Sequence, residues 1–136
     1  MSLFVDTSVW SLALRRDAQP DAAPVRMLRR AIESGETLLT TGLVLQELLQ
    51  GFSGPKARTQ ILERFAAVPL LAPDRDDHIG AAELRNVCRR AGVQVGTIAA
   101  LLAQLCVRHQ LTMLSTDNDF ARIAAHCALK LWTEAP

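Results

Sequence analysis

Short apolar runs alternate with longer segments of helical periodicity along this chain. The run 3–5 ends at once in the polar residues Asp6, Thr7 and Ser8, as expected for a strand that turns into a helix. Similar runs predict strands at 38–41, 112–115 and 129–132, and at most a short edge strand at 68–72 between prolines. Apolar spacing predicts helices over 24–34, 43–52, 56–65, 76–91, 97–109 and 118–126.

Strands that alternate with helices predict a parallel sheet with helices on both faces. We therefore expect an α/β fold, a three-layer α/β/α domain with a central parallel sheet of four to five strands. A chain of 136 residues fits one compact domain, and residues 1–136 are treated as that domain.

Composition narrows the class of protein. Lys and Arg number 15 against 14 Asp and Glu, so the chain is not a polycationic nucleic-acid coat and any nucleic-acid contact must be local. Cys88, Cys106 and Cys127 are widely separated and form no CxxC pair, which indicates reduced, mostly buried thiols. The sequence has no secretory leader and no apolar span of about 20 residues, so we expect a cytoplasmic protein without a membrane segment.

Acidic residues follow the predicted strands. Asp6 follows the first strand, Glu47 lies one turn into the helix after the second, and Asp117 and Asp119 follow the strand that ends at Ser115. Singly, each is more typical of a helix cap or a solvated side chain. Together they would converge at the carboxyl edge of the sheet and repel one another unless a divalent cation neutralised them. Oxygen ligands suit Mg²⁺ or Mn²⁺, and the matching chemistry is phosphodiester hydrolysis.

Hydroxyl side chains flank the same segments. Thr7, Ser8, Ser115 and Thr116 can hold a metal-bound water or a phosphate oxygen, and they can equally cap helix N-termini.

Basic residues precede the turn that leads to the helix at 97–109. Arg85, Arg89 and Arg90 are candidates for nucleic-acid phosphate contacts near the acidic residues, and Arg15 and Arg16 are weaker ones. The alternative for the first three is that they are cations favoured at a helix C-terminus. Because aromatic residues make up only 4% of the chain, extensive base stacking is not expected.

Four segments carry a family resemblance: FVDTSVW at 4–10, LVLQELLQG at 43–51, RRAGVQVGTIAALLA at 89–103 and LSTDNDF at 114–120. In this order they resemble the PIN domain and, within it, the VapC ribonuclease toxins of bacterial VapBC toxin–antitoxin pairs. The resemblance implies a metal-binding acidic cluster of Asp6, Glu47, residue 99 and Asp117, with Asp119 as an additional acid. It also implies an Mg²⁺- or Mn²⁺-dependent endoribonuclease of structured RNA such as tRNA or rRNA, a homodimer, and a cognate VapB-like antitoxin.

Position 99 departs from that family pattern, because the expected aspartate is Ala99. We interpret Ala99 as a replaced metal ligand, which would leave this chain inactive or impaired. Loss of a single acid from an otherwise complete set favours deliberate replacement, a hypothesis that a native gene encoding alanine here would refute. The alternative is a naturally non-catalytic PIN-fold module that binds RNA or antitoxin.

Overall fold

The structure is a computed structural model that describes residues 1–15 and 22–134. Every element predicted from the sequence is present, and its ends agree within two residues. The elements in chain order are β1 Ser2–Val5, α1 Thr7–Leu14, α2 Ala23–Glu33, β2 Thr37–Thr41, α3 Gly42–Gly51, α4 Pro55–Phe65, β3 Leu70–Leu71, α5 Arg75–Arg90, α6 Thr97–Arg108, β4 Thr112–Leu114, α7 Asp119–Ala124 and β5 Lys130–Leu131.

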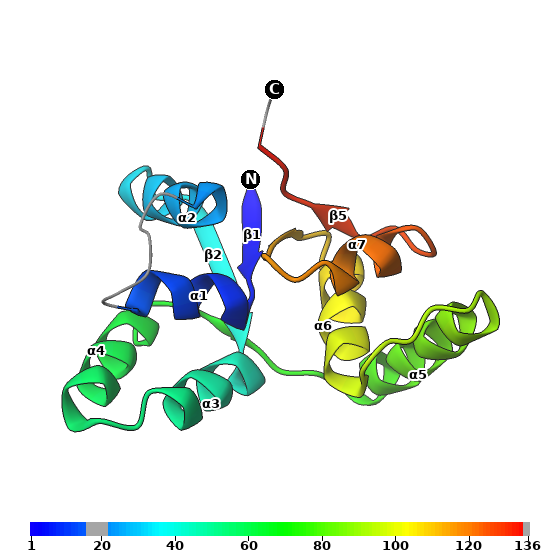
Figure 1. Ribbon diagram of the computed structural model, residues 1–136, viewed down its shortest axis with the longest axis horizontal. Coiled ribbons are helices and arrows are strands. Elements are labelled where there is room, and N and C mark those ends of the chain that lie inside the picture. The colour runs from blue at the N-terminus through cyan, green and yellow to red at the C-terminus, as the bar shows by residue number, and fades with distance from the viewer. Residues whose placement is uncertain (16–21, 135–136) are drawn as a thin grey trace.

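The strands form one five-stranded sheet in the order β3-β2-β1-β4-β5, and every neighbouring pair is parallel. Figure 1 shows the sheet in the middle of the molecule, with α1 to α4 gathered on one side and α5 to α7 on the other. The α/β prediction with four to five parallel strands is thus confirmed. The chain leaves β1 toward β2 on one side and later returns to β4 on the other, so the strand order reverses between β1 and β4.

The central strands are the most buried part of the molecule. Leu3, Phe4 and Val5 of β1 and Met113 and Leu114 of β4 are completely buried, because helices cover both faces of the sheet. Their continuous apolar runs therefore follow from the parallel topology.

Several helical residues that the apolar pattern assigns to the core are instead exposed. Ile32, Leu62, Ile79, Val87 and Ile98 have exposed fractions from 37% to 50%. On α5 the buried positions are Asp77, Ala81, Leu84 and Cys88, so the helix is rotated relative to the face that its large apolar residues suggest. Small residues turn toward α6 because the two helices pack closely: a Cβ at Gly80 would come within 2.5 Å of Gln104 Nε2.

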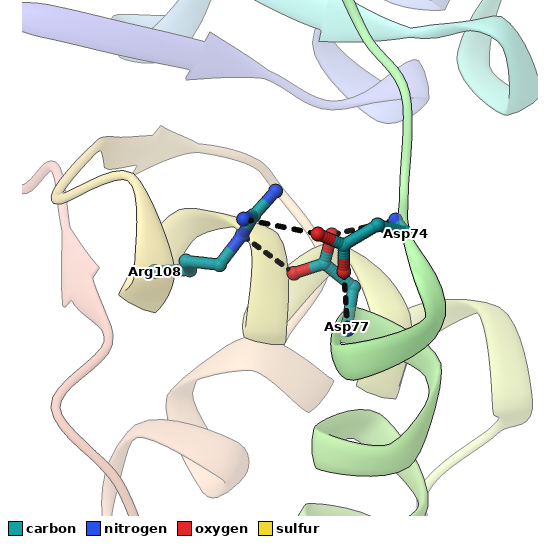
Figure 2. Close-up of polar contacts among 3 residues, drawn as sticks. All are labelled: Asp74, Asp77 and Arg108. Atoms are coloured by element: carbon teal, nitrogen blue, oxygen red, sulfur yellow. Dashed lines mark hydrogen bonds and ion pairs between the residues drawn. The ribbon is translucent and has the colours of Figure 1, made fainter.

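A charged cluster joins the first turn of α5 to the last turn of α6 (Figure 2). Asp74 and Asp77 form a capping box in which each side chain accepts a hydrogen bond from the other's backbone N–H, both at 2.9 Å. Arg108 Nε lies 2.7 Å from Oδ1 of the fully buried Asp77, but the N–H direction is too oblique for a hydrogen bond, so the contact is an ion pair. The backbone N–H of Asp77 and the charge of Arg108 lower the pKa of the Asp74 carboxyl.

The cysteines are free thiols, as expected: Cys88 and Cys106 are buried and Cys127 is half-buried. Within residues 1–15 and 22–134, no helix is both long and apolar enough to span a bilayer.

Candidate active site

Three of the four predicted acidic residues come together where the strand order reverses. Asp6 directly follows β1, and Asp117 lies in the segment after the neighbouring strand β4. Glu47 lies in α3, which follows β2 on the other side of β1. The carboxyl ends of parallel strands open a crevice at such a reversal, where α/β proteins bind ligands.

A hollow of about 270 Å³ lies there, and we call it the acidic pocket. Its polar side comes from β1–α1, α3 and the β4–α7 segment, and its apolar side comes from α6 and α7. The lining residues are Asp6, Thr7, Ser8, Glu47, Ile98, Ala99, Leu102, Asp117 and Phe120. A larger hollow of about 440 Å³ at the start of β2 is mostly apolar and has no converging carboxylates, so it is not the better candidate for acid-dependent chemistry.

Two serine hydroxyls hold Asp6. Ser8 Oγ and Ser115 Oγ each donate to Asp6 Oδ2 at 2.8 Å, and the aspartate is only 7% exposed. The same hydroxyls accept backbone N–H groups from the β4–α7 segment: Ser8 from Thr116 and Ser115 from Asp117, both at 3.0 Å. Both serines therefore tie the end of β1 to the segment that carries Asp117.

One oxygen of each other carboxylate in the pocket is also held. Thr7 Oγ1 donates to Glu47 Oε1 at 3.0 Å, and the backbone N–H of Asp119 donates to Asp117 Oδ1 at 2.9 Å. The second oxygens of Asp6, Glu47 and Asp117 accept no hydrogen bond from any described residue, and no described cation pairs with these groups. Each of the three carboxylates is thus held through one oxygen, and its second oxygen has no hydrogen-bond donor among the described residues.

Ala99 also lines the pocket, in the first turn of α6. In residues 1–15 and 22–134, no set of three or more histidine, cysteine or acidic side chains is close enough to hold a metal ion. The donor set still fits Mg²⁺, because this ion is commonly held by one or two carboxylates and retains several waters.

Cys106 is buried near Asp6 and adds no thiolate to the pocket. Burial, and secondarily the negative charge of Asp6, raise the pKa of the Cys106 thiol far above its usual range. The thiol therefore stays protonated at neutral pH.

Some residues proposed from the sequence lie outside the acidic pocket. Asp119 opens α7 and pairs with Arg122 at 2.9 Å, and Thr116 reaches the site through its backbone N–H alone. Arg85 donates from Nε to the Val95 carbonyl at 2.8 Å, and Arg89 donates to Asn86. None of Arg85, Arg89, Arg90 and Arg15 lines the pocket, and Arg16 lies outside the described residues.

Sequence reasoning missed the apolar wall. Apolar spacing assigns Leu102 and Ile98 to the core of α6, and it gives no role to Phe120. The signal that could have found them is the helical period, since residues 98 and 102 are one turn apart and both neighbour residue 99 on the helix surface.

We call the hydrogen bonds of Ser8 and Ser115 with Asp6 and with the β4–α7 segment the serine bridge, and we expect them to stabilise the fold. Replacing Ser115 with alanine removes a donor to a buried carboxylate and an acceptor for the Asp117 N–H, so we expect a loss of about 1–2 kcal/mol of unfolding free energy. Denaturant unfolding measures this. The exposed Ser53→Ala variant is the control and should change stability by less than about 0.5 kcal/mol. Equal effects of the two substitutions would contradict the bridge.

The fold and the pocket place this chain among the open parallel α/β domains, which bind their ligands at the carboxyl ends of the strands where the strand order reverses. The chain belongs to the PIN domain family, whose pattern matches residues 3–126.

Solved structures with the same fold cover almost the whole chain. A chain of VapBC2 from Rickettsia felis, bound to a promoter DNA fragment, is 20% identical with a TM-score of 0.73, covering 97% of this chain and 98% of its own. A chain of VapBC-1 from nontypeable Haemophilus influenzae is 14% identical with a TM-score of 0.75, covering 97% of each. VapC20 of Mycobacterium tuberculosis, a sarcin–ricin loop cleaving toxin, is 22% identical with a TM-score of 0.63, covering 91% and 95%.

Proposed function

We propose that this chain is the toxin of a bacterial VapBC-type toxin–antitoxin pair, a cytoplasmic metal-dependent endoribonuclease of structured RNA such as tRNA or rRNA whose activity is lost or impaired because residue 99 is alanine. The observation that carries the proposal is the convergence of Asp6, Glu47 and Asp117 on one pocket, each with one oxygen fixed and one open. Membership of the PIN domain family and likeness to VapBC structures support it.

Asp6 and Asp117 would hold Mg²⁺ or Mn²⁺ through their open oxygens, and Glu47 would contact it through water. The bound ion would supply Lewis-acid stabilisation of phosphoryl oxygens and help to activate water. The chain's own residues would do the rest: the serine bridge fixes the spacing of the two aspartates, and the open oxygen of Glu47 accepts a proton from a water in the pocket.

Partners follow from the same proposal. Similar structures are described as complexes of VapB with VapC-type chains, so we propose a VapB-like antitoxin as the cognate partner and a homodimer as the working assembly.

A second candidate function is binding without cleavage. The methyl group of Ala99 in the pocket wall favours it, because a nuclease site of this kind would be short of one carboxylate. In that case the chain would sequester RNA or hold antitoxin.

Mn²⁺ titration tests the metal site of this chain. We expect saturable binding, seen as loss of the free-ion electron paramagnetic resonance signal, and about tenfold weaker binding in the Asp117→Asn variant. The control is Asp76→Asn, an exposed acid on α5 outside the pocket, which should bind Mn²⁺ like the parent. Equal losses in both variants, or no saturation in the parent, would contradict the proposed site.

Incubation of the Ala99→Asp variant with purified tRNA and rRNA, in Mg²⁺ and in EDTA, tests the reaction itself. Metal-dependent cleavage at defined positions supports the nuclease, and its absence favours the binding module.

A further inference from the structure

The groove between α5 and α6 connects the acidic pocket with a group of arginines. It has a volume of about 340 Å³ and shares Ile98 with the acidic pocket. It also shares Arg85 with a third hollow of about 210 Å³ that contains Arg89 and Gln94. The shared lining residues place the three hollows next to one another, as a path beside the first turn of α6.

The orientation of the two helices places the arginines at the end of α5 nearest the acidic pocket. Arg108 at the end of α6 contacts Asp74 and Asp77 at the start of α5, so the helices run antiparallel. The end of α5 therefore lies beside Thr97 and Ile98 at the start of α6. Figure 1 shows α5 on the outer side of α6, away from the sheet.

The lining of the path combines apolar and basic side chains. Ile98, 44% exposed, forms an apolar wall of the groove together with Ala81 and Leu101. Arg85, Asn86 and Arg89 present nitrogen donors beside the start of α6. No described carboxylate forms an ion pair with Arg85, Arg89 or Arg90.

The helix dipole alone does not explain why Arg85 lies at the groove. Its Nε donates to the Val95 carbonyl, and no described residue accepts from its other guanidinium nitrogens. Because Arg85 is followed by five more residues of α5, the preference for cations in the last turn does not account for its position.

We propose that this path, named the α5–α6 path, binds a single-stranded segment of RNA that extends from the phosphate in the acidic pocket. The inference rests on the proposed nuclease function and adds the route of the substrate. A groove of this volume admits a group of about nucleotide size against the apolar wall, and it does not admit a duplex. Arg85 and Arg89 then contact backbone phosphates, which positions RNA without reading its sequence.

The test is fluorescence anisotropy of a 5′-labelled 12-nucleotide single-stranded RNA in EDTA, over a series of salt concentrations. We expect the double variant Arg85→Lys/Arg89→Glu to bind at least tenfold more weakly. We also expect the slope of log affinity against log salt to fall by about 0.7 for each phosphate that the variant no longer neutralises. Retaining a lysine at position 85 limits the structural damage, and circular dichroism checks that the variant is folded.

The matched control is Arg58→Glu, which makes the same charge change as Arg89→Glu on the exposed surface of α4. It should alter affinity by less than about twofold. An equal loss of affinity in both variants would show diffuse electrostatic binding and overturn the path.

Other outcomes separate this path from the proposed function. If the parent binds RNA and the double variant binds equally well, the path is wrong while the function stands. If the parent binds no RNA at any salt concentration, the path is overturned, and the cleavage assay of the Ala99→Asp variant decides the function independently. If the double variant loses affinity for polyglutamate but keeps its affinity for RNA, the occupant of the path is an acidic polypeptide and the RNA path is overturned.

Discussion

The Ala99→Asp variant is expected to cleave RNA at least about 100-fold faster than the parent chain in Mg²⁺ or Mn²⁺, and to lose this gain in EDTA. Residue 99 lines the acidic pocket together with the three existing acids, so an aspartate there adds an oxygen ligand where the wall now presents a methyl group. A tighter ion and a better-placed water both follow from a fourth carboxylate. Gel analysis of end-labelled tRNA and rRNA fragments measures the rate.

Ala57→Asp provides a closely matched control. Ala57 is the third residue of α4 and Ala99 is the third residue of α6, and both are half-buried, so each aspartate gains the same helix N-terminal stabilisation. Ala57 is not a lining residue of the acidic pocket, and its variant should show no gain in cleavage. The Ala99→Asn variant, which carries the neutral isostere of aspartate, separates charge from shape and should remain near the parent rate.

The Ala99→Asp substitution should also change the thermal stability of the chain. Without metal, a fourth carboxylate increases repulsion in the pocket and should lower the melting temperature, and Mn²⁺ should restore it. A variant that is folded, binds Mn²⁺ and still cuts no RNA would reject the nuclease and leave the binding module.

The Arg108→Met variant is expected to lose about 3 kcal/mol of unfolding free energy, or about 10 °C in melting temperature. Asp77 is completely buried, and Arg108 is the cation that neutralises it, so removal of the arginine leaves a buried carboxylate without a partner charge. Thermal and urea unfolding measure the loss.

A surface ion pair of the same type controls for the removal of an arginine. Arg122 pairs with Asp119 at 2.9 Å while 62% of its side chain is exposed, so Arg122→Met should cost less than about 1 kcal/mol. Adding Asp77→Asn to Arg108→Met removes the uncompensated charge and should recover part of the stability. No recovery in the double variant would contradict the electrostatic explanation.

Local sequence determined the elements and the identity of the acids. The run Leu3–Val5 followed by Asp6 predicts a strand that ends in a polar turn, and the structure has that turn. Strand and helix periods are local properties of the backbone, so each element was accessible without long-range information. The departure from the family pattern at Ala99 is likewise a prediction from the order of nearby motif residues.

Only the tertiary structure decided which residues share a surface. Strand order places β4 beside β1 although over a hundred residues separate Asp6 from Ser115, and the hydrogen bonds between them depend on that pairing. The local pattern also did not predict which face of α5 is buried. Gly80 packs against Gln104, so the face with the small residues is buried and Ile79 remains exposed. The sequence therefore identified the acidic residues. Long-range packing determined the dimensions of the pocket, its apolar wall and the groove beside it, because contacts between distant segments form only when the whole core is buried.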